Sequence, residues 1–174
     1  MSADAAWLSL PMADKTAVPD LAPAPAPAVP QALTDAPGYQ VRRLHQAYVA
    51  LWGRAVDATL TGPQFAVLTA VHAAPGRDQR SMASAVALDT STMADVARRL
   101  ENRGLLVRRT DTADGRRKLL YPTDEGERTL RAVHERARCL GERLLEPYDD
   151  ERRADLLRLL TSLADRWEGL ATGC

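Results

Sequence analysis

The chain has 174 residues, 45% hydrophobic and 26% charged, and its 23 basic and 23 acidic residues give a formal net charge of zero. A chain of this length can bury one core, and a neutral balance neither favours nor excludes nucleic acid, so the local distribution of charge has to decide. No run of about 18 apolar residues and no basic, then apolar, N-terminus is present, so we expect no membrane span or secretory signal and a cytoplasmic protein.

Residues 1–37 differ in composition from the rest of the chain. Seven of the 11 prolines lie there, and residues 22–30 largely alternate between alanine and proline. Proline lacks a backbone N–H and restricts the residue before it, so such a run cannot hold a helix. We predict that residues 1–37 form a disordered or polyproline-like arm.

A helical pattern begins after this arm. Apolar residues recur at alternating spacings of three and four, at Val41, Leu44, Tyr48, Leu51 and Ala55. This spacing is typical of a helix that packs along another helix. We therefore interpret residues 38–60 as an N-terminal dimerisation helix.

Two shorter helices are predicted before the centre of the chain. Thr61-Gly-Pro-Gln64 has the form of a capping box with proline in the first turn, and it opens the first of them. Asp78 caps the second, which we expect to run from Gln79 to Ala87. Backbone N–H groups and the helix dipole favour a phosphate at its start. The side chains at that start are Gln79, Arg80 and Ser81.

The central helix is predicted between Asp89 and Gly104. Asp89 can accept from the free N–H groups of the first turn, and Gly104 can take the left-handed position after the last turn. The apolar face carries Met93, Val96, Ala97 and Leu100. The opposite face carries Thr90, Ser91, Thr92, Asp95, Arg98 and Arg99. Such a face suits a major groove, with hydroxyls against base edges and arginines on phosphates, although a merely solvated helix would show the same pattern.

A basic hairpin is predicted after this helix. Two strand-like runs, Leu105–Arg109 and Lys118–Tyr121, are joined by a loop whose Asp114–Gly115 pair is a strong turn signal. From Arg98 to Lys118 there are eight basic and three acidic residues, an excess of five positive charges in a neutral chain. Helices and hairpin in this order predict a winged helix-turn-helix over 61–123, whose arginine-tipped loop can enter a minor groove.

Residues 124–174 repeat the apolar spacing of the first helix twice. The first seam consists of Leu130, Val133, Ala137, Leu140 and Leu144. The second consists of Leu156, Leu160, Leu163, Trp167 and Leu170. These seams have more apolar edge than one small domain covers by itself, so we expect C-terminal dimerisation helices and a homodimer. The predicted fold is mainly α, with a small β-hairpin wing and dimerisation helices at both ends.

The histidines and cysteines show no catalytic or metal-binding pattern. His45, His72 and His134 fall on three different predicted helices without the carboxylate spacing of a zinc site. Cys139 and Cys174 predict no disulfide framework. We expect no cofactor, no metal and no enzymatic activity, and we keep a redox-responsive regulator using Cys139 as an alternative.

Residues 88–93, 99–109 and 111–126 resemble the MarR family of dimeric winged-helix transcriptional regulators, and the resemblance extends from Gly38 to about Trp167. The last segment is similar to the family's wing signature, here at Asp114, Arg116, Thr123 and Gly126. The resemblance implies that Arg116 enters the minor groove while Asp114 orients it, and that the helix after Asp89 reads the DNA. Pro122 departs from the pattern and should shorten the second wing strand, because proline cannot donate to the ladder.

The family resemblance also implies an effector, often a phenolic or aromatic acid, bound between the dimer helices and the winged helix. Four side chains are predicted to line such a cleft, namely His45, Tyr48, Trp52 and His72. The alternative is that Tyr48 and Trp52 belong to the dimer core and that the histidines are surface groups.

Together these patterns predict a transcriptional regulator that binds double-stranded DNA, at a pseudo-palindromic operator, as a ligand-responsive repressor. The alternative is a winged-helix module for dimerisation or protein interaction that does not bind DNA. Four segments are expected, 1–37, 38–60, 61–123 and 124–174. The predicted DNA contacts are Gln79, Arg80, Ser81, Thr90, Ser91, Thr92, Asp95, Arg98, Arg99, Asp114, Arg116 and Arg117.

Overall fold

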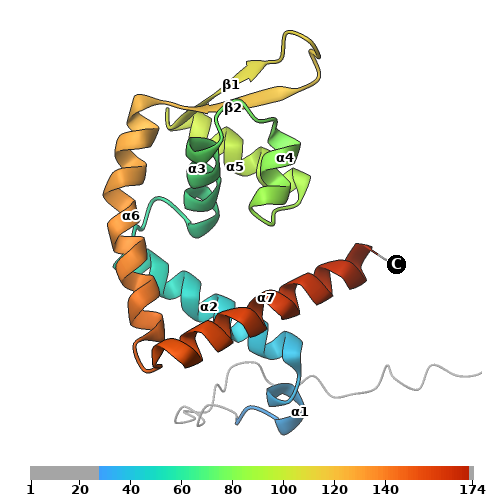
Figure 1. Ribbon diagram of the computed structural model, residues 1–174, viewed down its shortest axis with the longest axis vertical. Coiled ribbons are helices and arrows are strands. Elements are labelled where there is room, and N and C mark those ends of the chain that lie inside the picture. Colours follow the sequence, from blue (N-terminus) through green and yellow to red (C-terminus); the bar gives the residue numbers. More distant parts are fainter. Residues whose placement is uncertain (1–27, 173–174) are drawn as a thin grey trace, which may run out of the picture. The chain divides into compact units, whose positions relative to one another are not determined.

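The computed structural model describes residues 28–172. Its elements in chain order (Figure 1) are α1 (Gln31–Thr34), α2 (Pro37–Ala55), α3 (Gly62–Ala73), α4 (Gln79–Ala85), α5 (Thr90–Asn102), β1 (Leu106–Thr110), β2 (Lys118–Pro122), α6 (Asp124–Leu145) and α7 (Asp150–Thr172). The chain divides into two compact units, Met1–Gln40 and Val41–Cys174. The predicted mainly helical fold with a β-hairpin is confirmed.

In the described part of the first unit, residues 28–40, the short helix α1 lies within the segment predicted as a disordered arm. The Thr34 hydroxyl donates to the Gln31 carbonyl (2.8 Å), and the Gln40 amide donates to the Thr34 carbonyl (2.6 Å). This helical turn begins directly after Pro30, where the alternation of alanine and proline ends. Most of the predicted arm, residues 1–27, lies outside the described residues.

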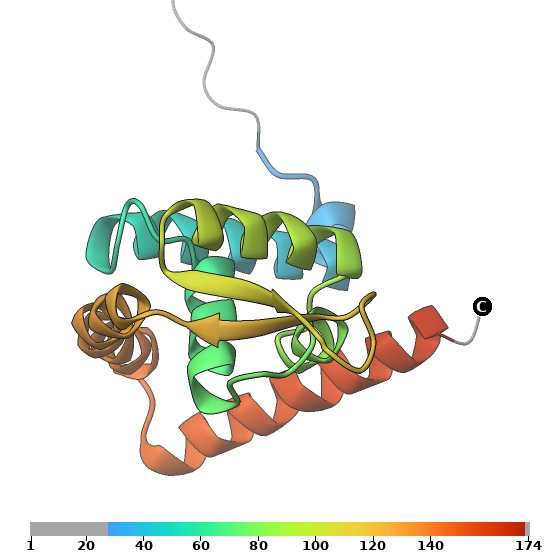
Figure 2. The ribbon, with the colours of Figure 1, turned by 90° about the horizontal axis from the view of Figure 1, so that it is seen from above.

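The core of the second unit lies between α3, α5, α6 and the hairpin. Figure 2 shows the two strands next to α5, with α3 passing beneath them. Each element contributes fully or almost fully buried apolar side chains, including Leu68, Val71, Met93, Leu100, Leu106, Leu120 and Val133. The apolar face predicted for the central helix is therefore confirmed as its buried face, which leaves the polar face outside.

The ends of α5 follow the predicted capping. The Asp89 carboxylate accepts the backbone N–H groups of Ser91 and Thr92, both at 2.9 Å. Gly104 adopts a left-handed conformation (φ +69°), and its N–H donates to the Glu101 carbonyl at 2.8 Å. A residue with a Cβ would be strained there. Both ends of α5 are thus determined by short-range hydrogen bonds.

The shorter helices begin as predicted, but α4 ends early. Thr61 and Gln64 form the full capping box at the start of α3. Asp78 caps α4, accepting from the Ser81 N–H at 3.1 Å. The helix stops at Ala85, two residues before the predicted end, because Ala87 has a φ of +52° and turns the chain into α5.

The hairpin pairs β1 with β2 in antiparallel register, from Leu106 opposite Pro122 to Thr110 opposite Lys118. The other edge of β2 is joined to the segment before α4. The Gly76 N–H donates to the Leu120 carbonyl (2.8 Å), and the Leu120 N–H donates to the Arg77 carbonyl (3.0 Å). The wing is therefore hydrogen-bonded to the helix-turn-helix as well as to itself.

The expectation that Pro122 would shorten the second wing strand is wrong, because β2 includes Pro122 as its last residue, paired with Leu106. The Thr123 N–H donates to the Leu105 carbonyl across the hairpin (3.2 Å), whereas the Leu120 N–H points the other way. N–H directions alternate along a strand, so Pro122 has the orientation of Leu120. Proline there removes no hydrogen bond between the strands.

Two residues of the wing signature fasten α6 to the end of α5. The Thr123 hydroxyl donates to the Gly104 carbonyl (2.6 Å) and accepts the Gly126 N–H (3.0 Å), which caps α6. A Cβ built on Gly126 would lie 1.9 Å from the Leu105 carbonyl oxygen. Gly126 is required because the backbone passes too close for any side chain.

Much of the apolar surface of the terminal helices remains exposed. In α2, Val41, Leu44, Tyr48 and Leu51 are 48%, 62%, 40% and 38% exposed. In α7, six large apolar side chains each have an exposed fraction of at least 39%, namely Leu157, Leu159, Leu160, Leu163, Trp167 and Leu170. None of the described helices is long and apolar enough to cross a membrane.

Replacing Gly126 by alanine should destabilise the protein by about 1–3 kcal/mol, since the new methyl group must displace the Leu105 backbone. The matched control is Gly141→Ala in the same helix, where a Cβ would have no neighbour within 4 Å. That change should be neutral or stabilise the fold by up to about 1 kcal/mol, because alanine favours a helix over glycine. Chemical denaturation of both variants measures this difference, and equal stabilities would contradict the close approach.

Candidate nucleic-acid interface

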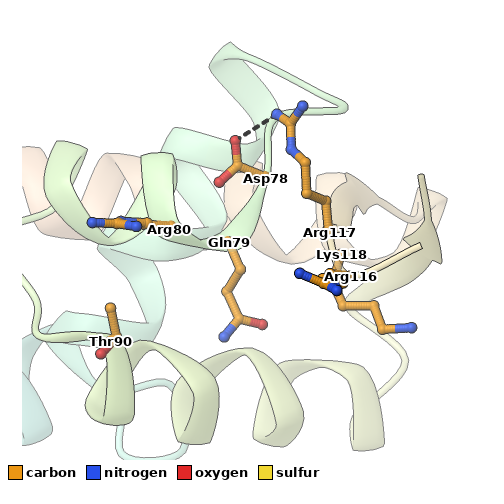
Figure 3. A pocket seen from close by; sticks show the side chains of 7 residues that line it. All are labelled: Asp78, Gln79, Arg80, Thr90, Arg116, Arg117 and Lys118. Atoms are coloured by element: carbon orange, nitrogen blue, oxygen red, sulfur yellow. Dashed lines mark hydrogen bonds and ion pairs between the residues drawn. The ribbon is translucent and has the colours of Figure 1, made fainter. Parts of the chain in front are cut away.

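A basic recess of about 490 Å³ lies where the starts of α4 and α5 meet the end of the wing loop. We define the basic recess by its lining residues, Asp78, Gln79, Arg80, Thr90, Arg116, Arg117 and Lys118 (Figure 3). Five of the predicted DNA contacts are therefore brought together from three chain segments: Gln79, Arg80, Thr90, Arg116 and Arg117. The other seven lie outside the lining.

The hydroxyls of Ser91 and Thr92 are engaged in the cap of α5. Each donates to the Asp89 carboxylate, at 2.5 Å. Hydrogen bonds from the Ser91 hydroxyl first, and then from Thr92, hold the pKa of Asp89 well below its usual value. In this conformation the two hydroxyl oxygens can offer lone pairs outward but not their protons.

Further along α5 the charged side chains are exposed. Arg98 pairs with Asp95 (3.0 Å), so these two predicted contacts form one ion pair on the outer face. Arg99 is also exposed on this face. The ion pair is solvent-exposed and therefore weak, which leaves the Arg98 side chain free to exchange partners.

The tip of the wing is a closed loop held by its own aspartates. Asp114 accepts the backbone N–H of Arg116 (3.0 Å), so it fixes the main chain rather than the guanidinium. The Asp114 carbonyl also accepts the Arg117 N–H (2.9 Å), and the Arg117 carbonyl accepts the Asp111 N–H (3.0 Å). Among residues 28–172, no hydrogen bond or ion pair holds the Arg116 guanidinium.

Arg117 is held very differently from Arg116. Its guanidinium pairs with Asp78 at 2.9 Å and with Asp111 at 3.5 Å (Figure 3). The hydrogen bond and charge of Asp78 raise the pKa of Arg117. In turn, the pKa of Asp78 is well below its usual value, mainly through the Ser81 hydroxyl and N–H and then through Arg117.

Two residues of the recess were not among the predicted contacts. Lys118 directly follows Arg116 and Arg117, and its ammonium group donates to the Thr110 hydroxyl across the hairpin (2.7 Å). The continuous run of three basic residues was a sufficient signal for it. Asp78 was predicted as a helix cap, and nothing local in the sequence indicates its partner in the wing.

A second candidate site, which we call the aromatic cleft, has a volume of about 610 Å³. Its lining includes three of the predicted ligand contacts, namely His45, Tyr48 and Trp52. The Trp52 ring lies 6.0 Å from that of Tyr48 and 5.3 Å from that of Phe65. Trp52 is 5% exposed and donates to the Leu60 carbonyl (2.7 Å), so it also supports the fold. Burial raises the pKa of Tyr48.

The fourth predicted ligand contact, His72, does not join the cleft. Its Nδ1 lies 3.9 Å from a carboxylate oxygen of Glu127, and its side chain is 50% exposed. The reason is its place at the C-terminal end of α3, beside the first turn of α6, whereas the cleft lies at the N-terminal end of α3.

Three residues near the cleft were not among the predicted ligand contacts. A hollow that shares Tyr48 and Trp52 with the cleft also reaches Phe65, His134 and Arg138. The His134 ring lies 6.5 Å from that of Phe65. These residues meet only when α3 and α6 pack together, so no local spacing indicated them.

The cysteine of the redox alternative is exposed on α6. The Cys139 thiol lies 3.8 Å from the carboxylate of Glu135, one turn earlier. Cys174 lies outside the described residues. Among those described, no group of three or more histidine, cysteine, aspartate or glutamate side chains has a metal-binding arrangement.

The family model described as "MarR family" matches residues 60–118. The transcriptional regulator HosA of Escherichia coli O127:H6 is 39% identical over 95 residues, which cover 55% of this chain and 70% of HosA.

Solved structures show the same relationship over more of the chain. The transcriptional regulator PcaV of Streptomyces coelicolor, in complex with its natural ligand, has a TM-score of 0.75 and 42% identity, covering 80% of this chain and 97% of PcaV. The transcriptional repressor CouR bound to a 23-mer DNA duplex has a TM-score of 0.69 and 30% identity, covering 77% and 96%. CouR from Rhodococcus jostii RHA1 bound to p-coumaroyl-CoA has a TM-score of 0.65 and 31% identity, covering 78% and 96%. This chain therefore belongs to the MarR family of transcriptional regulators.

Proposed function

We propose that this regulator binds double-stranded operator DNA as a homodimer and acts as a repressor that a small aromatic or phenolic compound releases. The observation that carries the proposal is the basic recess, which joins the start of α5 to the wing. The aromatic cleft and the exposed apolar helices supply the other two parts.

DNA recognition is assigned to α5 and the wing. The first turn of α5 would face base edges through Thr90 and the oxygens of Ser91 and Thr92, with Arg98 and Arg99 near phosphates. The start of α4 would hold a phosphate near Gln79, Arg80 and Ser81. Arg116, whose guanidinium has no partner among residues 28–172, is free to enter the minor groove. The DNA complex of CouR supports this assignment.

A second copy of the chain is the proposed cover for the apolar faces of α2 and α7. The exposed fraction is 62% for Leu44 and 58% for Leu159, and other large apolar side chains of these helices are similarly exposed. Soluble monomers rarely expose so much contiguous apolar surface. A twofold dimer would present two copies of α5, which predicts a pseudo-palindromic operator with half-sites about one helical turn apart.

Effector binding is assigned to the aromatic cleft, because its lining includes the turn before α5 and the loop between α2 and α3 that contacts the end of α5. Val86 and Leu88 line the cleft and flank Ala87, the residue with φ +52° in the turn before α5. At the other end, Arg103 donates to the Thr59 carbonyl (2.8 Å).

Thr59 in turn lies beside a carboxylate of the cleft. Its N–H donates to Asp57 (2.7 Å), which lines the cleft and pairs with Arg136 of α6 (3.4 Å). An aromatic occupant that shifts these two loops would move α5 relative to the wing. The ligand complexes of PcaV and CouR support a small-molecule effector.

Arg116→Ala should weaken DNA binding by about 1–3 kcal/mol. The steepness with which log affinity falls against log salt, which we call the salt slope, should decrease by about one, because one cationic contact is lost. Fluorescence anisotropy over a salt series measures both quantities, on a duplex that the unaltered protein enriches from a random-sequence library. Arg131→Ala is the control, because Arg131 is an exposed arginine (66%) on α6, outside the recess. A folded Arg116→Ala protein that binds like the unaltered one would sink the wing assignment.

Aromatic acids that occupy the cleft should raise the melting temperature and dissociate the DNA complex. At a concentration about 100 times the Kd, the stabilisation is about 2.7 kcal/mol. Tyr48→Phe, which removes a hydroxyl from the cleft, should weaken a phenolic effector about two- to tenfold if that hydroxyl bonds it. This variant is preferable to Trp52→Ala, which would also remove the bond to Leu60.

The matched control is Tyr148→Phe, since Tyr148 is similarly exposed (43%) but lies outside the cleft. Equal thermal shifts in the Tyr48 variant and the unaltered protein would remove this hydroxyl from the site. A screen in which no aromatic acid shifts the melting temperature or releases DNA would contradict the effector assignment.

A further inference from the structure

The two adjacent arginines in the wing loop, just before β2, have different surroundings. Both line the basic recess, but only Arg117 turns back toward α4 (Figure 3). One of its terminal nitrogens lies 2.9 Å from Asp78 and the other 3.5 Å from Asp111. Among the described residues, Arg116 has no such partner.

The two carboxylates that hold Arg117 are themselves well shielded. Their side chains are 17% and 16% exposed, whereas the Arg117 side chain is 50% exposed. A phosphate approaching this guanidinium would meet the field of two carboxylates, one hydrogen-bonded to it and the other 3.5 Å away. The attraction that an isolated arginine offers to DNA is therefore largely cancelled here.

The ion pair continues a set of backbone contacts between the wing and the start of α4. The Gly76 N–H donates to the Leu120 carbonyl, and the Leu120 N–H donates to the Arg77 carbonyl. Asp78 forms an isolated antiparallel β-bridge with Leu119 beside these two hydrogen bonds. Arg117 directly precedes β2, so its ion pair with Asp78 adds a side-chain contact to this junction at the side nearest the wing tip.

We infer that Arg117 is a positioning residue: with Asp78 it holds the wing against the start of α4, and it makes no phosphate contact of its own. This inference rests on the proposed DNA binding, and it revises the expectation that Arg117 contacts DNA. By fixing the wing, Arg117 sets where Arg116 stands relative to α5. Arg117 thus positions the wing, whereas Arg116 contacts the DNA.

The test is a double-variant comparison in the full chain. Arg117→Gln removes the charge, and Asp78→Asn removes the ion pair while keeping a good helix-capping residue. Arg117→Gln should weaken DNA binding about two- to fivefold, the effect of one exposed ion pair, without changing the salt slope. In the Asp78→Asn background the same change should have a clearly smaller effect, because only the longer ion pair between Arg117 and Asp111 remains to be lost.

Arg116→Gln is the comparison variant, and it should lower the salt slope by about one in either background. The duplex is again one that the unaltered protein enriches from a random library. The inference is overturned if Arg117→Gln also lowers the slope by about one and weakens binding equally in both backgrounds, which is the behaviour of a direct phosphate contact.

A measurement without DNA separates this inference from the proposed function. Amide hydrogen exchange at Gly76 and Leu120 should become faster in both Arg117→Gln and Asp78→Asn, and it should stay unchanged in Arg116→Gln. Unchanged exchange in the first two variants would refute the positioning role. If the unaltered protein bound no duplex at all, the proposed function would fail, while the exchange rates would still decide whether Arg117 holds the wing.

Discussion

The carboxylate of Asp78 connects the parts of the chain that form the basic recess. One oxygen accepts the Ser81 N–H and caps α4, and the other accepts the Ser81 hydroxyl and pairs with Arg117. These donors keep the pKa of Asp78 well below its usual value, so it is ionised at neutral pH. The direction of α4 and the position of the wing therefore depend on one charged group. Without it, α4 would lose its N-terminal cap and the wing would lose its ion pair with the start of α4.

A second junction fixes the other side of the winged helix. Thr123 and Gly126 hold the start of α6 against Gly104 and Leu105, at the point where α5 turns into β1. The close passage of Gly126 explains why a residue without a side chain belongs there. Glu101 adds a further link, because its carboxylate accepts from the Arg108 guanidinium and N–H and its pKa is lowered by that arginine. The wing is thus fixed at its base by both neighbouring helices, while its tip extends beyond them.

This arrangement separates the surface that would read DNA from the cleft that would bind an effector. The basic recess lies at the start of α5, whereas the aromatic cleft is lined by the turn before α5 and by the loop between α2 and α3, to which Arg103 at the end of α5 is hydrogen-bonded. Ala87 and Arg103, which flank α5, are therefore the places where a change in the cleft can reach the DNA-binding face. His72 takes no part in this connection, because it faces Glu127 at the far end of α3.

Local sequence patterns were enough to predict α2 to α7, the hairpin and most of their ends, because caps such as those at Thr61, Asp89 and Gly104 depend on residues within a few positions. It also located the basic face of α5 and the charged hairpin, since both are local patterns. The different surroundings of residues that look alike in the sequence depend on tertiary contacts. Arg117 meets a carboxylate 39 residues away, while Arg116 beside it meets none among the described residues. Likewise, Pro122 costs the hairpin no hydrogen bond, because a residue two positions from Leu120 faces the same way, and the Leu120 N–H points toward Arg77 and not toward β1. The ring of His134 lies near that of Phe65 only because α6 packs on α3. Such contacts depend on how distant segments cross in space, and residue spacing along the chain carries no record of that crossing.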